Sequence, residues 1–452
     1  MPGLSPRDRR YRRGGHVTWT QDDGLIMIWG GVAEHVYRKP KGPNKSPDCG
    51  NSFHDPGCVT VFDPELEVWG DQRTGGRVPP PTVAPAAACQ QGETLFVFGG
   101  LVMLETPGGY YELQTSSSLH TLSLTTWQWT EVRLEREQRP PPPSEKGVAW
   151  HHADSFYVFG GFCWDGDQLE RRRSQGGRQG GGQGEFEVSR DVETGGGWHN
   201  ALVRYRPSQQ APSVHWPVFT GALPSPRAGA AVCSVGREVF IFGGRCRQRR
   251  LNDLYRLDLL SLTCTTVHTD TNPDMFGPPS SLEPAPRSLH SLTYDGEGRL
   301  VVYGGLGQLS APLNDCWVLE VETERWREQE LGYDHGQVRC WHSALLSHQQ
   351  VIIHSGLTQE FYLTRADLDD HCEDFLRLQF GKTTTSLRKL ALESVINYLT
   401  STTDEDQVIE IIESLPPMLK KSVLTRISET SDQSSETGTD TEYSRSRLHS
   451  GV

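Results

Sequence analysis

The feature that most constrains this fold is a short apolar run that ends at a pair of glycines and recurs six times within residues 25–356. Because aliphatic and aromatic residues follow one another in each run without polar alternation, each run predicts a strand that is buried on both faces. The glycine pair predicts a positive φ angle or a close approach of another backbone segment. The copies are LIMIWGG (25–31), LFVFGG (95–100), FYVFGG (156–161), VFIFGG (239–244), LVVYGG (300–305) and the degenerate VIIHSG (351–356).

Two further patterns accompany the glycine pairs. Most pairs are followed by a second predicted strand with a tryptophan near its end, although the fourth copy has Cys264 at that place. These tryptophans are Trp69, Trp129, Trp216 and Trp326. Several pairs are preceded by a segment of the form Arg-x-x-His, or close to it, which begins at Arg13, Arg227, Arg287 and Arg339.

The repeats predict the fold class. A sheet of about four strands cannot bury both of its faces alone, so such units are stable only when they pack on one another. Six of them around a common axis form an all-β, six-bladed β-propeller, which we expect over residues 1–381. The alternative is a β-sandwich, in which the six copies of the apolar run and its glycines would be a coincidence. Two insertions, 39–57 and 163–197, are rich in glycine and other turn residues and are expected to be surface loops.

The pattern changes after the predicted propeller. Apolar residues from Leu387 to Leu399 recur at steps of three and four, which predicts an amphipathic helix. Two more apolar stretches, separated by Pro416 and Pro417, extend the predicted helical region over 386–427. Residues 428–452 are too polar to bury a core, so we expect a disordered tail.

Composition and motifs exclude several function classes. Acidic residues outnumber basic ones by 57 to 44, which disfavours a protein that coats nucleic acid or an anionic membrane. No apolar run approaches the length needed to cross a bilayer, and the arginine-rich start predicts no secretory signal. The ten cysteines include no CxxC pair, so reduced thiols and a cytoplasmic and nuclear location are expected. Without a catalytic or metal-binding motif, we expect neither an enzyme nor a cofactor; a metal-dependent propeller enzyme is the rival.

The motifs resemble a known family. The glycine pairs and tryptophans resemble the kelch repeat. The stretch SLRKLA (386–391) resembles the elongin-binding box of cullin-RING receptors, with Leu387, Leu390 and Ala391 as its contact residues, although cysteine is usual at the last. The stretch LPPML, followed by Val423, is similar to the cullin-2 version of the cullin box, through Leu415, Pro416, Leu419 and Val423. Together they resemble the kelch substrate receptors of cullin-2 RING ubiquitin ligases that recognise C-terminal glycine degrons.

The residues that follow the glycine pairs suggest a binding site. They are expected to surround the propeller axis at one face, and five of the six are apolar. The exception is Arg245, and a cation among apolar neighbours favours an anionic ligand. Arg250 lies five residues further on and can return to the same place, where two guanidinium groups can hold one carboxylate. The alternative is that both arginines are solvated loop charges in the run RCRQRR.

The resemblance assigns roles to these positions. It implies that Arg245, Arg250 and Ser288 bind the carboxylate of a C-terminus, and that Trp164, Trp198 and Leu289 form the wall around it. Leu289 stands where the receptors usually have tryptophan. The implied partners are elongin B and elongin C, cullin-2 with its RING subunit, and substrate proteins with an exposed C-terminal glycine. The chain's own end, Ser450-Gly451-Val452, suggests self-association through the same site. The alternative function is a kelch scaffold for a cytoskeletal or small-GTPase partner.

Overall fold

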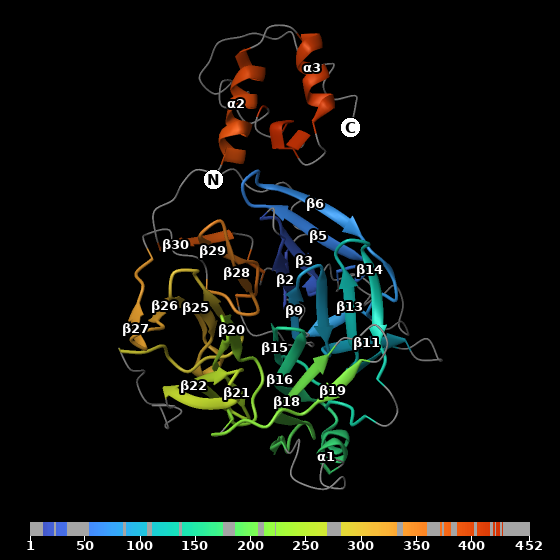
Figure 1. Cartoon of the computed structure of the whole chain (residues 1–452), viewed down its shortest axis with the longest axis vertical. Coiled ribbons are helices and arrows are strands. Elements are labelled where there is room, and N and C mark those ends of the chain that lie inside the picture. The colour runs from blue at the N-terminus through green and yellow to red at the C-terminus, as the bar shows by residue number, and fades with distance from the viewer. Residues whose placement is uncertain are drawn as a thin grey trace, which may run out of the picture.

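The computed structural model describes most of the chain as a six-bladed β-propeller followed by helices (Figure 1). The described residues are 12–21, 24–33, 54–84, 87–105, 111–134, 138–174, 186–206, 212–221, 223–268, 282–331, 338–358, 371–372, 375–380, 387–401, 405–415, 419–420, 422–424 and 427. The predicted fold class is confirmed. Most of the 39–57 insertion, the 428–452 tail and the tail's proposed self-association lie outside these residues.

The blades are antiparallel sheets that follow one another along the chain. Blade 1 comprises β2 (Val17–Thr20), β3 (Ile26–Trp29), β5 (Cys58–Asp63) and β6 (Val68–Arg73); blade 2, β9 (Ala87–Gln91), β10 (Thr94–Phe98), β13 (Leu119–Ser123) and β14 (Gln128–Val132); blade 3, β15 (Val148–His152), β16 (Ser155–Cys163), β18 (Gly197–Arg206) and β19 (Ser213–His215). Blade 4 comprises β20 (Ala231–Val235), β21 (Glu238–Cys246), β22 (Arg249–Asp258) and β23 (Thr263–His268); blade 5, β24 (Ser291–Tyr294), β25 (Arg299–Leu306), β26 (Pro312–Glu320) and β27 (Arg325–Glu328); the described part of blade 6, β28 (Ser343–Ser347), β29 (Gln350–His354) and β30 (Phe375–Gln379).

Shorter strands extend this framework. Strand β7 (Gly75–Gly76) runs parallel to β14 at the outer edge of blade 2. Five more short strands flank the first two strands of blades 1 and 2. In blade 1, β1 (Arg13–Gly14) pairs with β4 (Val32–Ala33). In blade 2, β11 (Leu101–Glu105) pairs with β8 (Thr82–Ala84) and β12 (Tyr111–Thr115). A short 3-10 helix, Gln308–Ser310, lies in the loop that follows β25.

The six apolar runs are strands, as predicted, and each is the second strand of its blade. Their side chains are buried on both faces and form the cores between neighbouring blades. The glycine pairs adopt positive φ angles, for example 64° at Gly243 and 107° at Gly244. A Cβ atom on Gly243 would lie 2.8 Å from the carbonyl oxygen of Arg287 in the next blade. Glycine is therefore required here both by its φ angle and by the close approach of a neighbouring backbone.

The predicted tryptophan-bearing strand is wrong in detail. Three of the predicted stretches contain two strands joined by a tight turn, and the tryptophan lies on the outer one. In the stretch that ends at Trp216, the tryptophan directly follows β19. Trp69 lies on β6, Trp129 on β14 and Trp326 on β27. Both strands carry buried apolar residues on either side of a turn of only four residues, such as 64–67, so the stretch was predicted as a single strand.

The arginines of the Arg-x-x-His segments hold four of the blades together. We call the segment that precedes the first strand of each blade its leading loop; the Arg-x-x-His segments are the leading loops of blades 1, 4, 5 and 6. The four arginines are at most 1% exposed. Each donates a hydrogen bond from Nη1 to the carbonyl of the first residue of the glycine pair, or its Ser-Gly equivalent, in its own blade. The bonds run from Arg13 to Gly30, from Arg227 to Gly243, from Arg287 to Gly304, and from Arg339 to Ser355. Arg227 and Arg287 also form two-pronged ion pairs with Asp253 and Asp315.

The ring closes by packing blade 6 against blade 1. Strand β2 lies beside β28, and no strand is shared between the two blades among the described residues. Backbone hydrogen bonds cross the junction from Gly15 N to Trp341 O at 2.9 Å and from Gly356 N to Arg13 O at 3.0 Å. The Oγ of Ser343 also donates to the carbonyl of His16 at 3.2 Å. The junction thus resembles the other interblade contacts.

The 163–197 insertion is not simply a loop, contrary to the sequence-based expectation. It contains helix α1 (Gly166–Ser174) and strand β17 (Val188–Arg190), which pairs with β18. Cys163, Leu169 and Phe186 form a small buried cluster with the blade, which stabilises this order. The glycine-rich composition concealed it, because only a few apolar residues carry the packing.

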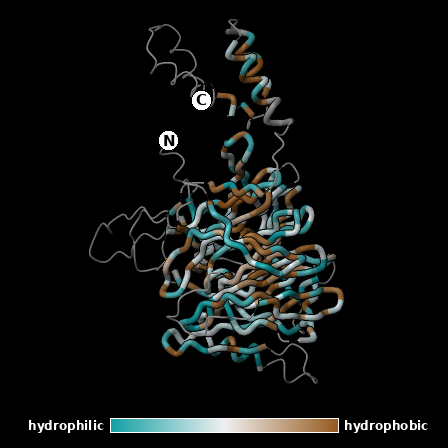
Figure 2. Tube along the Cα trace, turned by 90° about the vertical axis from the view of Figure 1, so that its left-hand side faces the viewer, coloured by the Kyte–Doolittle hydropathy of each residue, from teal (hydrophilic) through white to brown (hydrophobic). Residues whose placement is uncertain are grey.

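The C-terminal helices lie beyond one side of the propeller, next to β5 and β6 (Figure 1). They are α2 (Leu387–Ser401) and α3 (Glu405–Ser414), followed by helical residues at 419–420 and 422–424. Figure 2 shows hydrophobic residues along this helical region. Among the described residues, every helix falls short of the length and apolarity that a bilayer crossing requires.

Candidate functional site

The third residues of the leading loops meet at the propeller axis. In five blades this residue has a positive φ angle between 55° and 67°: Gly15, Lys146, Gly229, Leu289 and Trp341. Backbone hydrogen bonds of 2.7–3.0 Å run from the N–H of Gly15 to Trp341, from Trp341 to Leu289, from Leu289 to Gly229, and from Gly229 to Lys146. Left-handed backbone costs about 1–2 kcal/mol for a residue with a side chain. The hydrogen-bonded chain around the axis holds Lys146, Leu289 and Trp341 in it.

An apolar cluster surrounds this axial chain. It contains Leu101, Leu306 and Leu357, which directly follow the glycine pairs of blades 2, 5 and 6, together with Leu289, Cys340 and Trp341. The expectation that residues after the glycine pairs gather at one end of the axis holds for these three leucines. We refer to these six residues as the axial cluster.

Arg245 and Arg250 lie directly opposite each other in the β21–β22 hairpin of blade 4. Residues directly opposite in an antiparallel pair project from the same face of the sheet, and two like charges in this relation lower stability. The Arg245 backbone also pairs with Ala228 in the leading loop of blade 4. Its Nε donates to the carbonyl of Arg247 at 2.8 Å, and the side chain stays partly exposed. Two guanidinium groups therefore share one face, and one of them is accessible.

Arg250 and Ser288, two of the residues predicted to bind a carboxylate, are in direct contact with each other. Arg250 is only 3% exposed. Its Nε donates to Ser288 Oγ at 3.0 Å and its Nη2 to Ser310 Oγ at 3.1 Å. The Ser288 backbone pairs with Leu306 of the axial cluster. The guanidinium group of Arg250 is thus held by two hydroxyl groups beside the apolar residues at the axis.

The aromatic residues form a second wall, on blade 3. The ring of Phe162 lies 5.3 Å from that of Trp164 and 4.9 Å from that of Trp198. Trp198 is buried and packs with Ala228, whereas Trp164 is 42% exposed. Leu289, the third predicted wall residue, lies in the axial cluster instead. Trp164 and Trp198 therefore belong to one aromatic surface next to blade 4, and Leu289 lies at the axis.

Three residues near this site were not predicted. Ser310 and Gln308 come from the loop after β25, and the Gln308 side chain bonds to the backbone of Arg250. Lys146 lies at the axis, with its Nζ 5.3 Å from the centre of the Trp341 ring and 3.0 Å from Glu145 Oε1. Aligning the leading loops would have found Lys146, because it corresponds to Leu289 and Trp341. No such signal marks Ser310.

Two titratable groups near these residues are held in their neutral forms. Burial raises the pKa of the nearby Cys246 thiol, so it remains protonated near neutral pH. Burial also lowers the pKa of His290, with a further contribution from Arg287, so this imidazole remains neutral. Across the described ranges, no group of three or more His, Cys, Asp or Glu side chains is arranged to hold a metal ion. What the site offers an incoming ligand is positive charge, hydroxyl groups and apolar surface.

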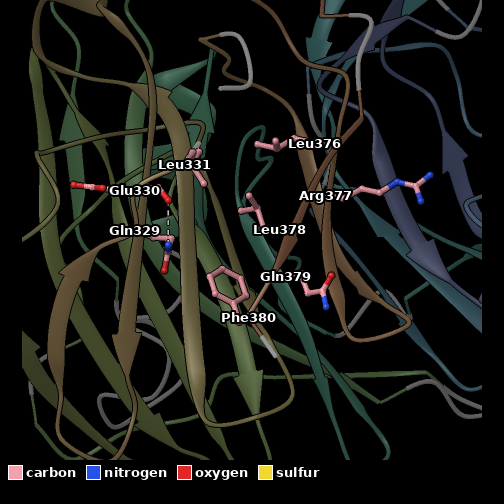
Figure 3. Close-up of a pocket in the computed structure, with 8 residues that line it drawn as sticks. All are labelled: Gln329, Glu330, Leu331, Leu376, Arg377, Leu378, Gln379 and Phe380. Atoms are coloured by element: carbon pink, nitrogen blue, oxygen red, sulfur yellow. Dashed lines mark hydrogen bonds between the residues drawn. The ribbon is translucent and has the colours of Figure 1, made fainter. Parts of the chain in front are cut away.

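A separate concave region lies between the outer parts of blades 5 and 6 (Figure 3). It is lined by Gln329, Glu330, Leu331, Leu376, Arg377, Leu378, Gln379 and Phe380. Leu331, Leu378 and Phe380 belong to the core between these blades, and Arg377 is bound to the turn of blade 1. The region is therefore a seam between blades, and it includes none of the predicted site residues.

The predicted partner-binding residues of the helical region are only partly described. The backbone of Leu387, Leu390 and Ala391 lies in α2, but their side chains, like all of Pro416, lie outside the described set. Leu415 and Leu419 are partly buried. Val423 is 0% exposed within the helical cluster, so it serves internal packing and is not a surface residue of this chain.

Comparison with known proteins defines the family. The model of the KLHDC2/KLHL20/DRC7 Kelch-repeats domain matches residues 15–174 and 191–391. The chain belongs to this family. It is 28% identical to human Kelch domain-containing protein 1 over 382 residues, covering 81% of this chain and 80% of the relative. It is 26% identical to bovine Kelch domain-containing protein 2 over 393 residues, covering 85% and 84%. The solved structure of YjhT aligns with a TM-score of 0.51 at 14% identity, covering 83% of this chain and 97% of YjhT, which supports the fold alone.

Proposed function

We propose that this kelch protein is the substrate-recognition subunit of a cullin-2 RING ubiquitin ligase and binds the C-terminal ends of its substrates. The observation that carries the proposal is the opposed pair Arg245 and Arg250, with Arg250 held against Ser288 beside the axial cluster. This arrangement occurs in blade 4, whereas the corresponding residues after the glycine pairs of blades 2, 5 and 6 are leucines.

A carboxylate is the ligand that best fits this arrangement. Two guanidinium groups on one face repel each other until an anion lies between them. A carboxylate accepts from both at once, and hydrogen bonds to charged groups contribute about 1.5–3 kcal/mol each. Ser288 Oγ accepts from Arg250 Nε, so its own O–H remains able to donate a further hydrogen bond to the carboxylate.

The surroundings favour the end of a chain over an acidic side chain. A C-terminal carboxylate can enter along the axis with the rest of the peptide trailing outward. The axial cluster and the aromatic wall of Trp164 and Trp198 then contact the last residues. A terminal glycine brings no side chain, so these walls can approach its backbone closely.

The helical region supplies the ligase contacts in this proposal. Leu387, Leu390 and Ala391 bind elongin C as an apolar helix face in a groove, which brings in elongin B, and Leu415, Pro416 and Leu419 contact cullin-2. Tyr398 and Ile409 are 47% and 45% exposed, so the described helices carry apolar surface that a partner could cover. The protein itself makes and breaks no bond, and the other subunits transfer ubiquitin to the captured substrate.

A peptide-binding screen tests the recognition step. Peptides that vary only in the last two residues, each with a free or an amidated carboxyl end, are titrated into wild type and the double variant Arg245→Ala, Arg250→Ala. We expect tightest binding to a free terminal glycine, at least tenfold weaker binding after amidation, and little binding to the double variant. Equal affinity for free and amidated peptides would refute carboxylate recognition.

Copurification tests the ligase assignment. We expect elongin B/C to copurify with wild type and to be lost from Leu387→Asp, with a weaker loss from Leu387→Ala. Asn397→Asp, a change at an exposed position of the same helix, is the matched control and should retain elongin. If wild type fails to retain elongin while the propeller binds peptides, the protein is a kelch scaffold without a link to ubiquitin.

A further inference from the structure

One turn of blade 1 differs from its counterparts in other blades. The two outer strands of blades 1, 2, 4 and 5 are joined by equivalent turns, each with a left-handed residue: Glu67, Trp127, Leu262 and Glu324, at φ between 53° and 57°. The residue before it is exposed and polar in blades 2, 4 and 5, where it is Thr126, Ser261 and Thr323. In blade 1 it is Leu66, which is only 2% exposed. We call residues 63–68 the blade-1 turn.

The C-terminal helices are what cover Leu66. Leu66 and Val68 belong to one buried cluster with Leu392 and Leu399 of α2, Ile412 of α3, and Val423. Ser422 is fully buried, and its Oγ donates to the carbonyl oxygen of Leu66 at 2.9 Å. The helices thus contact the propeller through apolar packing and a directional hydrogen bond at the same turn.

The blade-1 turn is itself held firmly. Asp63 Oδ1 accepts hydrogen bonds from the backbone N–H groups of Glu65 and Leu66 at 3.0 and 2.9 Å. From blade 6, Arg377 Nη2 donates to the carbonyl of Pro64 at 2.9 Å and to Glu67 Oε1 at 3.0 Å. Two blades therefore fix the position of the turn, so a helix docked on it inherits that position.

We propose that the blade-1 turn is a docking site for the C-terminal helices, and that it sets the orientation of the ligase-binding helix relative to the peptide site. The docking of the helices follows from the contacts of Leu66, Val68 and Ser422 alone. The role of this docking in orienting the ligase for ubiquitin transfer rests on the proposed function. Short helices in isolation are marginally stable in water, so burying their apolar face against Leu66 and Val68 also keeps them folded.

Hydrogen exchange tests the docking without assuming any partner. The variant Leu66→Asp places a charge in the buried cluster, and Ser422→Glu does so from the helical side without changing a propeller residue. The matched control is Thr323→Asp, at the equivalent exposed turn position of blade 5. We expect backbone amides of α2 and α3 to exchange at least tenfold faster in both test variants, and at the wild-type rate in Thr323→Asp.

Two further measurements separate the possible failures. Amide exchange in β21, β25 and β29 should stay at the wild-type rate in all variants, which verifies a folded propeller. If α2 and α3 exchange at the wild-type rate in Ser422→Glu while the propeller is intact, the docking proposal is overturned. If docking is lost as expected, substrate ubiquitylation should fall while peptide affinity stays within twofold. Unchanged ubiquitylation would overturn the orienting role, and failure of wild type to bind elongin would overturn the proposed function alone.

Discussion

Two groups of arginines occupy this propeller in different ways. Arg13, Arg227, Arg287 and Arg339 recur at the same place in their blades and donate to the equivalent carbonyl. Arg245 and Arg250 lie opposite each other in blade 4, and Arg250 contacts serine hydroxyls next to the axial cluster. The repeated arginines perform the same structural task in four blades, so they serve the fold. The pair of blade 4 departs from the repeat, and the repulsion between its two charges lowers stability. A local feature that lowers stability is expected at a functional site, which fits the proposed peptide site.

The largest stability effect is expected at a repeated arginine. Burial alone would raise the pKa of Asp315, but the ion pair with Arg287 outweighs it and holds the pKa below its usual value. Arg287→Ala leaves this carboxylate without its main partner and should lower the free energy of unfolding by about 3 kcal/mol or more. Urea unfolding measures the change. A loss below 1 kcal/mol would contradict the structural role.

The repeated histidines of the leading loops should make stability depend on pH. Burial, aided by Arg339, lowers the pKa of His342 to about 3, and burial lowers those of His16 and His290 as well. A group whose pKa is lower in the folded than in the unfolded state stabilises the fold above about pH 6.5 and loses that effect as pH falls. His342 alone should contribute about 2 kcal/mol between pH 7.5 and pH 5.

Stability and peptide affinity should depend on pH differently. Arginines and a terminal carboxylate keep their charges between pH 6 and pH 8, so peptide affinity should be flat over a range in which the urea midpoint falls. Stability that does not decline toward pH 5 would show that these imidazoles become charged in the folded state.

Two glycines of the glycine pairs should lose different amounts of stability when changed to alanine. Gly30 and Gly304 have φ angles of 67° and 58°, so both substitutions incur about 1–2 kcal/mol of backbone strain. A Cβ on Gly304 would also lie 2.7 Å from Arg339 O, whereas a Cβ on Gly30 meets nothing within 4 Å. Gly304→Ala should therefore lower the free energy of unfolding by about 1–3 kcal/mol more than Gly30→Ala. Equal losses would mean that interblade contact is irrelevant to this position.

The smallest effect is expected at an arginine outside both groups. Arg247 is exposed and donates to Ser189 Oγ at 2.8 Å. Arg247→Ala should change the free energy of unfolding by less than about 0.5 kcal/mol and peptide affinity by less than threefold. A loss comparable to that of Arg250→Ala would indicate that general positive charge, and not the opposed pair, attracts the ligand.

The sequence was sufficient for features that repeat. Five glycine pairs and a sixth, degenerate copy, each after a buried strand, predicted the propeller, because each repeat carries the same burial and backbone demands. The helical period predicted the helices after residue 386, and the interrupted repeat singled out Arg245. A feature that recurs in several repeats can be recognised by comparing the repeats with one another.

Features made by a single contact could not be predicted. The contact of Ser310 with Arg250 depends on how the loop after β25 folds over blade 4. Leu66 is an ordinary apolar residue in the sequence, and its importance appears only when the equivalent turns are compared in space. Val423 fits a cullin-binding pattern, yet its burial depends on α2, α3 and blade 1 together.

A double-mutant cycle between the peptide carboxylate and Arg250 tests the central claim most directly. Affinities are measured for one glycine-ended peptide, free and amidated, with wild type and with Arg250→Ala, alongside Arg247→Ala as the control. If Arg250 binds the terminal carboxylate together with Arg245, amidation weakens binding at least tenfold in wild type and Arg247→Ala, but by a factor at least threefold smaller in Arg250→Ala. An equal effect of amidation in all three proteins would contradict the account.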